Sequence, residues 1–136
     1  MNSTVLLVDD DTGVLHALER LLRAHDYRPL TATSGGDGLR LMEKHEIPVV
    51  LSDQRMPGMS GIEFLTQVRE RWPRSVRLML SASSDFGTAT AAINRGEVYK
   101  FIAKPWDDDA LIAQIRSAFE RHEHNQRSDH FTRVFG

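Results

Sequence analysis

Short apolar runs alternate with segments of helical periodicity along this chain, in units of about 25 residues. We predict strands at the five apolar runs, which are residues 5–8, 28–32, 49–52, 76–81 and 98–103. The run at 49–52 is apolar without alternation, as expected of a strand that helices cover on both faces. Because strands joined by helices run parallel, the alternation predicts an α/β fold built on one parallel sheet.

The segments between and after these strands carry apolar residues at helical spacing. We predict helices at residues 12–25, from 34 onward, at 61–71, at 85–95 with Gly96 as the C-cap, and at 107–122. Five strand–helix units are too few for a closed eight-stranded barrel, so an open sheet is preferred. The prediction is a doubly wound, flavodoxin-like sheet of five parallel strands in the order 2-1-3-4-5, with five helices.

Composition narrows the class of protein further. The 136 residues suffice for one domain, which we place at residues 1–122, followed by a polar C-terminal tail or linker at 123–136. The tail can be either a frayed helix or a linker. The chain has no cysteine, which excludes disulfides, thiolate nucleophiles and zinc–thiolate sites. A net charge of −2 gives no global reason to expect direct nucleic-acid binding. The first residues form neither a basic segment nor a long apolar stretch, so we expect a cytoplasmic protein without membrane insertion.

Four of the apolar runs end at residues that can hold phosphate or a metal ion. Asp9 and Asp10 follow the first run, Asp53 follows the third, Ser81 ends the fourth and Lys104 follows the fifth. The carboxyl ends of parallel strands share one edge of the sheet, where open α/β folds place their ligand sites. In the predicted order, the first and third strands flank the point where the winding reverses, so the aspartates lie on both sides of one crevice.

These residue types together describe an aspartyl-phosphate site. Three carboxylates within a few ångströms repel one another, and the pKa of one of them rises strongly unless a cation intervenes. A set of oxygen ligands without histidine or cysteine favours a hard cation, with Mg²⁺ before zinc or copper. A carboxylate beside Mg²⁺ can attack a phosphoryl group, while Lys104 holds one phosphoryl oxygen and Ser81 donates to another.

Each residue also has a purely structural explanation when it is taken alone. The aspartates at 9–11 can cap a helix, and Asp53 can form an Asx turn before the Met-Pro-Gly that follows it. Ser81 can be a capping hydroxyl, and Lys104 can be a solvated lysine at a strand end. All these explanations would have to hold together at one edge of one sheet, and this coincidence favours a ligand site.

The same residues, over about 4–122, resemble the receiver domain of two-component response regulators, in the chemotaxis-receiver-like superfamily. The resemblance implies that Asp53 accepts a phosphoryl group from a histidine kinase or a phosphotransfer protein. It also implies that Asp10 and Asp53 bind Mg²⁺ directly, that Asp9 binds it through water, and that Arg55 contributes its backbone carbonyl.

The resemblance assigns roles to further residues. Ser81 matches the switch hydroxyl, although threonine is more frequent there, and Lys104 matches the lysine that contacts phosphate and precedes a cis proline. Phe101 takes the place of the aromatic switch residue, which is frequently tyrosine. Arg55 and Ser83 occupy positions that tune the lifetime of the phosphoryl group in this family.

The predicted helix at 85–95 is the element we expect to move. It is poor in large apolar side chains: Ile93 is nearly its only deep anchor, and Gly87 weakens it by about 1 kcal/mol relative to alanine. We expect phosphorylation to draw in Ser81 and to let Phe101 repack beneath this helix. The surface made by this helix, the last strand and the last helix would then bind a partner or a second copy of the chain.

Three functional hypotheses remain at this point. The first is a signalling receiver that catalyses its own phosphoryl transfer without turning over a metabolite. In this case the chain resembles receivers that are joined to output domains, such as those of σ54-type activators and cyclic-di-GMP phosphodiesterases. The second is a phosphatase of the haloacid dehalogenase type, which needs a second acid two residues after the nucleophile, where this chain has Arg55. The third is a receiver-like interaction module that is never phosphorylated.

Overall fold

Five parallel strands form one sheet in the order β2-β1-β3-β4-β5, as predicted. The structure is a computed structural model that describes residues 2–82, 86–95 and 97–135, with the backbone alone for 128–135. The strands are β1 (Thr4–Val8), β2 (Arg28–Ala32), β3 (Val49–Asp53), β4 (Val76–Ser81) and β5 (Lys100–Ala103). The helices are α1 (Thr12–Ala24), α2 (Gly35–Lys44), α3 (Gly61–Arg71), α4 (Phe86–Asn94) and α5 (Asp108–Phe135).

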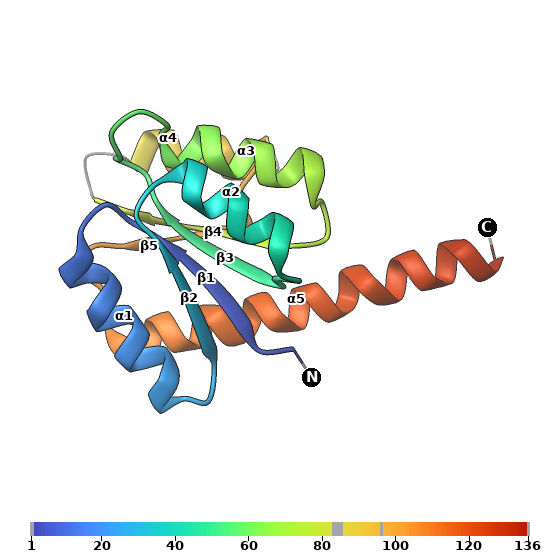
Figure 1. The fold of residues 1–136 in the computed structure, drawn as a ribbon. Helices are drawn as coiled ribbons and strands as arrows, with labels where there is room; N and C mark the ends of the chain where they lie inside the picture. Colours follow the sequence, from blue (N-terminus) through green and yellow to red (C-terminus); the bar gives the residue numbers. More distant parts are fainter. Residues whose placement is uncertain (1, 83–85, 96, 136) are drawn as a thin grey trace.

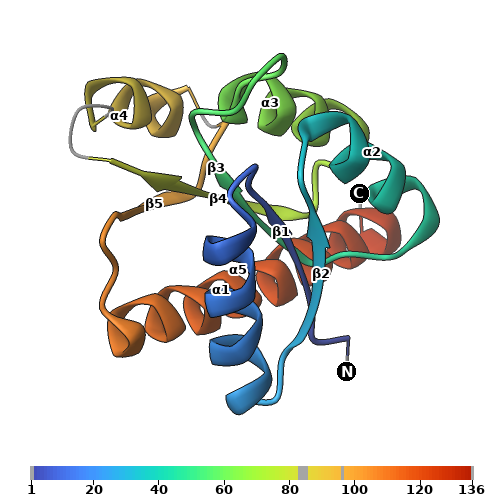
Figure 2. The same ribbon diagram turned by 60° about the vertical axis from the view of Figure 1, so that its left-hand side comes forward.

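Helices cover both faces of the sheet, with α1 and α5 on one face and α2, α3 and α4 on the other (Figures 1 and 2). Each face therefore has its own core. Leu18 and Leu22 of α1 are buried in the first, and Phe64, Leu65 and Val68 of α3 are buried in the second. Because both faces are covered, β1 and β3 consist of buried residues throughout.

The register of the strands aligns the residues that follow them. Val8 of β1 lies opposite Ser52 of β3. Asp9, which follows β1, and Asp53, the last residue of β3, therefore lie side by side. Asp53 lies opposite Leu80 of β4. Ser81 in turn lies opposite Ala103 of β5, which Lys104 follows. The carboxyl ends of four strands thus bring the predicted site residues to one edge of the sheet.

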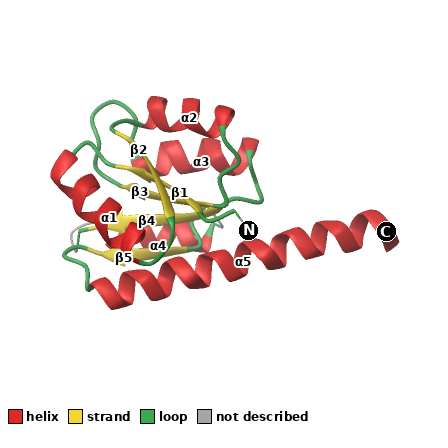
Figure 3. Ribbon diagram, turned by 60° about the horizontal axis from the view of Figure 1, so that its bottom comes forward, coloured by secondary structure: helices red, strands yellow, loops and turns green. Residues whose placement is uncertain are grey.

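The last helix is longer than predicted. The sequence pattern placed its end at about residue 122, but α5 continues to Phe135 and projects beyond the rest of the domain (Figures 1 and 3). The prediction was wrong because it used the loss of apolar residues as the end of the helix. Polar residues end the packing of a helix against the sheet but do not by themselves end the helix. Glycine and proline, the strongest helix breakers, do not occur between 106 and 135.

Other boundaries differ by one or two residues. β5 begins at Lys100, and the predicted start at residue 98 was two residues early. Asp53 itself is the last residue of β3. The predicted start of α4 at residue 85 and its predicted cap at Gly96 lie outside the described residues. Within the described ranges, no helix is both long and apolar enough to cross a membrane.

Candidate functional site

Three carboxylates meet at the carboxyl edge of the sheet. Each of Asp9, Asp10 and Asp53 offers an oxygen within 4.8 Å of the oxygens of the other two. Asp9 and Asp53 are buried, and Asp10 is exposed. The backbone N–H of Asp9 donates to Ala32 of β2 at 3.1 Å, and its Oδ1 accepts from the backbone N–H of Asp11 at 2.9 Å. The cluster is therefore fixed by the strands and by the turn into α1.

Lys104 completes the cluster from the other side. Its Nζ lies 2.8 Å from Oδ1 of Asp53 and 3.4 Å from Oδ2 of Asp9. Its backbone N–H donates to the carbonyl of Ser81 at 2.9 Å, which ties the end of β5 to the end of β4. The bond to Pro105 is cis, as the resemblance implied. The segment that follows β5 therefore presents the ammonium group directly to the carboxylates.

The charges in this cluster shift one another's pKa values. Burial raises the pKa of Asp9, and the neighbouring charge of Asp53 adds to this, whereas the Asp11 N–H and Lys104 act in the opposite direction. Burial disfavours the ammonium of Lys104, but the hydrogen bonds and negative charges of Asp53 and Asp9 outweigh it and raise the pKa of Lys104. The negative charges of the carboxylates thus repel one another, and binding of a further cation would reduce this repulsion.

The donor set suits a hard divalent cation. The cluster offers three carboxylates, two of them buried, and it contains no histidine among its members. Mg²⁺ prefers oxygen ligands of this kind and usually keeps some of its waters, which the exposed side of Asp10 allows. The residues that the structure brings together therefore fit Mg²⁺.

Removing one charge from the cluster is expected to stabilise the protein in the absence of divalent cations. In Asp9→Asn the amide oxygen can still accept from Asp11, but the buried charge and its repulsion with Asp53 are gone. The folded state raises the pKa of Asp9, so the gain should be present at neutral pH, shrink as the pH falls, and vanish below the ordinary value of 3.8. Melting temperatures in EDTA measure it. Added Mg²⁺ should stabilise wild type more than Asp9→Asn, and a lower melting temperature for Asp9→Asn in EDTA at pH 7 would contradict the prediction.

The resemblance assigned switch and tuning roles to four further positions. Ser81 is fully buried, and its hydroxyl donates to the carbonyl of Ala82 at 3.3 Å. Phe101 is partly buried, and its ring centroid lies 5.1 Å from that of Phe86 at the start of α4. Arg55 is exposed, two residues after Asp53. Ser83 lies outside the described residues.

Two residues that the sequence analysis did not single out hold Asp53 in place. The backbone carbonyl and side-chain Oε1 of Gln54 accept from the N–H groups of Gly61 and Ile62, both at 2.9 Å, at the start of α3. A Cβ atom on Gly61 would lie 2.2 Å from the carbonyl oxygen of Asp53. The one sequence signal for this contact was a glycine, a poor helix former, at the first position of a helix.

A family model supports the assignment that the geometry suggests. The model described as the response regulator receiver domain matches residues 5–116, which includes Asp9, Asp10, Asp53, Ser81 and Lys104. A curated relative, the hydrogenase transcriptional regulatory protein HoxA of Cupriavidus necator, is 43% identical over 118 residues, which are 87% of this chain and 24% of that protein. The chain spans about a quarter of the length of the curated relatives it matches.

Solved structures agree with this match. A structure of an adenylate cyclase from Rhodopirellula baltica has a TM-score of 0.93 and 34% identity, with 98% of each chain covered. A response regulator receiver domain protein from Clostridium thermocellum has a TM-score of 0.84 and 28% identity, with 89% of this chain and 97% of that chain covered. Domains of this family are signalling modules rather than metabolic enzymes. The chain therefore belongs to the family of receiver domains of two-component response regulators.

Proposed function

We propose that this domain accepts a phosphoryl group on Asp53 from a histidine kinase or a phosphotransfer protein. The observation that carries the proposal is the approach of Lys104 Nζ to within 2.8 Å of Asp53 Oδ1, beside the carboxylates of Asp9 and Asp10. A nucleophilic carboxylate with an ammonium group and a cation-binding cluster beside it is the arrangement that phosphoryl transfer needs. The phosphatase alternative lacks its second acid, because Arg55 stands at that position.

The residues of the site have distinct roles in this proposal. A carboxylate oxygen of Asp53 forms a bond to phosphorus as the bond between phosphorus and the donor's nitrogen or oxygen breaks, and the donor leaves with that electron pair. Lys104 exchanges its contact with Asp53 for one with a phosphoryl oxygen, and the Ser81 hydroxyl turns from Ala82 towards another. Mg²⁺ held by Asp9, Asp10, Asp53 and the backbone carbonyl of Arg55 would neutralise charge on the carboxylates and on the phosphoryl group.

Small phosphodonors test this function directly. After incubation with acetyl phosphate and Mg²⁺, the intact mass of the protein is expected to rise by one phosphoryl group, and EDTA in place of Mg²⁺ is expected to prevent the gain. A mass that stays unchanged with Mg²⁺ would support the interaction module that is never phosphorylated. Steady release of phosphate from p-nitrophenyl phosphate would support the phosphatase.

We also propose that phosphorylation changes the surface made by α4, β5 and α5. Only small side chains of α4 are buried. These are Ala89 and Ala92, and no atom lies within 4 Å of the place where a Cβ on Gly87 would lie. Its first residue, Phe86, is 37% exposed and packs on Phe101 of β5. An element with few buried contacts changes position at little energetic cost, so a shift of Phe101 can be passed to α4.

The far end of α4 is held more firmly. Glu97, just beyond it, accepts from Thr66 of α3 at 2.8 Å and forms an ion pair with Arg95. Hydrogen bonds from Arg95 and Thr66 lower the pKa of Glu97, so its charge is kept at neutral pH. We therefore expect α4 to move at its first turn, beside Phe86, and to stay attached at its last.

Amide hydrogen exchange tests this switch. With beryllofluoride and Mg²⁺ as a phosphoryl mimic, protection is expected to change in residues 86–92 and 100–103 and to stay nearly constant at 97–99. Thr66→Val, which removes a hydrogen bond to Glu97, should extend the change to the last turn of α4. Protection that is the same with and without the mimic across 86–103 would reject the proposed movement.

The proposal extends to partners. We expect the α4–β5–α5 surface to support a homodimer or to contact an output domain, since the curated relatives are about four times longer than this chain and include transcriptional regulators. The boundary of the receiver at residue 122, with a tail or linker at 123–136, stays part of this proposal.

A further inference from the structure

Methionine is the only sulfur-containing residue type in this chain. The sequence has five methionines and no cysteine. Met42, Met56 and Met79 are buried, and Met1 lies outside the described residues. Met59 is partly exposed, in the segment that joins β3 to α3. Among the methionines that the structure describes, Met59 is therefore the one that a small oxidant in the solvent reaches most readily.

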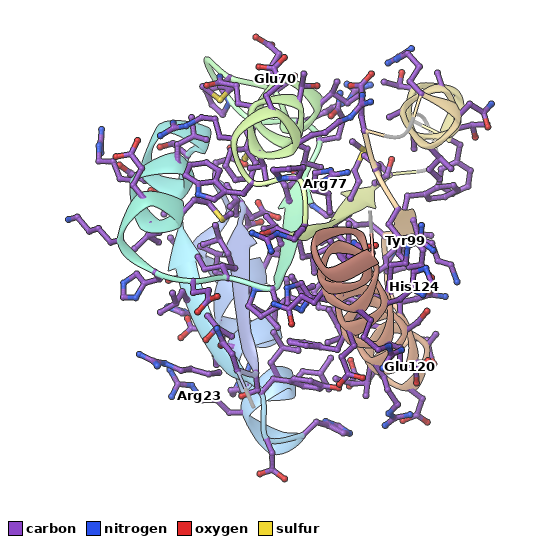
Figure 4. All side chains as sticks on the ribbon, turned by 90° about the vertical axis from the view of Figure 1, so that its right-hand side faces the viewer. Arg23, Glu70, Arg77, Tyr99, Glu120 and His124 are labelled. Atoms are coloured by element: carbon purple, nitrogen blue, oxygen red, sulfur yellow. The ribbon has the colours of Figure 1, made fainter. Side chains whose placement is uncertain are left out.

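The side chain of Met59 lies across the start of α2. A Cβ atom on Gly35, the first residue of α2, would lie 2.6 Å from the sulfur of Met59 and 3.1 Å from its Cγ. Because Gly35 has no side chain, the thioether can lie directly on the backbone of α2. The helices α2 and α3 pack side by side on one face of the sheet (Figure 4), and Met59 packs against the core beneath them. Met59 therefore holds the segment between β3 and α3 against α2.

A hydrogen-bond donor is directed at the sulfur of Met59. The Nε2 of Gln67, on α3, donates to this sulfur at 3.7 Å. A thioether sulfur is only a weak acceptor, whereas oxidation to the sulfoxide gives a polar group with an oxygen that accepts well. On the other side, a carbon atom at the Cβ position of Gly35 would already overlap the sulfur, so an added oxygen has no room there. The sulfoxide can therefore bind Gln67 and water, but it cannot keep the contact with Gly35 unchanged.

The segment that Met59 holds is joined directly to the phosphoacceptor. Ser60, the next residue, forms the capping box of α3. Gly61 follows, and its Cα lies so near the Asp53 carbonyl that a Cβ would be 2.2 Å from that oxygen. The same segment carries Arg55, whose backbone carbonyl belongs to the proposed Mg²⁺ site. A displacement of Met59 from α2 is therefore passed to the groups around Asp53.

We propose that Met59 is a site of reversible oxidation by peroxides, and that this oxidation slows the phosphorylation of Asp53. Only the second part rests on the function proposed above. A lone pair of the sulfur attacks one oxygen of hydrogen peroxide and the O–O bond breaks. The departing hydroxide takes the proton of the transferred oxygen, so the products are methionine sulfoxide and water. The sulfur is oxidised by two electrons, the peroxide is reduced, and methionine sulfoxide reductases can reverse the change.

The modification can be tested on the whole chain without any phosphorylation. After brief treatment with dilute hydrogen peroxide, peptide mapping by mass spectrometry measures the sulfoxide at each methionine. Met59 is expected to be oxidised several-fold faster than Met42, Met56 and Met79, because these three are buried. Oxidation of the buried methionines as fast as Met59 would overturn the site, and so would a Met59 that stays reduced.

The effect of oxidation is measured on the same samples. The melting temperature in EDTA is expected to fall by about 2 °C or more, since a polar group replaces an apolar contact with the core. The initial rate of mass gain from acetyl phosphate and Mg²⁺ is expected to fall by about threefold or more, because small displacements of reacting groups are costly. Treatment with both sulfoxide reductases, one for each epimer, should restore both values.

Two variants at residue 59 separate this effect from general peroxide damage. Met59→Leu keeps an apolar side chain of similar volume and cannot form a sulfoxide, so peroxide should change neither its melting temperature nor its rate. Met59→Gln places a polar amide at the same position and should reproduce both changes without peroxide.

The outcomes distinguish this inference from the proposed function. Oxidised protein that is phosphorylated as fast as untreated protein would overturn the effect on Asp53, and so would a loss of rate that persists in Met59→Leu. Untreated wild type that gains no phosphoryl group would contradict the proposed function and with it the effect on Asp53. In that case the sulfoxide map and the melting temperatures would still decide whether Met59 is the oxidation site.

Discussion

Asp53→Asn is expected to abolish the gain of one phosphoryl group from acetyl phosphate. The amide has no negative charge and is a poor nucleophile, so neither the kinase nor a small donor can phosphorylate it. The substitution also removes the ion pair with Lys104 at 2.8 Å and the negative charge of one of the three carboxylates offered to the cation. Intact mass after incubation with Mg²⁺ and acetyl phosphate measures the loss.

The fold of this variant should survive, because it relieves repulsion within the acidic cluster. Its melting temperature in EDTA, compared with that of wild type, checks this point. Asp37→Asn is a suitable control, since Asp37 lies in the first turn of α2 and is outside the cluster, and it should accept the phosphoryl group normally. A full gain of mass in Asp53→Asn would place the phosphoacceptor elsewhere.

Gly61→Ala is expected to have the largest effect on stability among substitutions of the glycines that the structure describes. The added Cβ would lie 2.2 Å from the Asp53 carbonyl oxygen and 2.8 Å from the Cα of Gln54, and both of these are backbone atoms that cannot turn aside. Either α3 or the end of β3 has to shift, at a cost of about 3 kcal/mol. Because the shift moves Asp53, phosphorylation by acetyl phosphate should slow as well. Chemical denaturation measures the first effect, and the rate of mass gain measures the second.

Gly36→Ala provides the matched control. Gly36 lies near the start of α2, and no atom lies within 4 Å of the place of its Cβ. Alanine there should leave stability unchanged or raise it by up to about 1 kcal/mol, through the better helix propensity of alanine. If Gly61→Ala unfolded at the same denaturant concentration as Gly36→Ala, the close approach of α3 to Asp53 would not be a constraint.

The acidic edge could be predicted from the sequence because topology alone determines it. Asp9, Asp53 and Lys104 each come directly after an apolar run, and parallel strands leave no other edge for their ends. The pattern requires no knowledge of side-chain packing. The same reasoning placed Ser81, whose backbone carbonyl accepts from Lys104, at that edge.

Contacts between distant segments could not be predicted in this way. The approach of Gly61 to Asp53 and the bond from Thr66 to Glu97 depend on the position of α3 relative to the sheet, which no local pattern encodes. The length of α5 was mispredicted because the loss of apolar residues was taken as the end of the helix, whereas it shows only where the helix stops packing against the sheet.

The length of α5 has a mechanical consequence. Its 28 residues correspond to about 42 Å, of which roughly 20 Å lies after His122. Thirteen residues alone form a marginal helix in water, but here the packed first half supplies the nucleus and the rest only has to propagate. The projecting part then acts as a lever arm: a tilt of about 10° at the sheet moves its tip by roughly 3 Å, given the rise per residue of an α-helix. A change too small to disturb the core can thus be magnified into a displacement that a neighbouring surface detects.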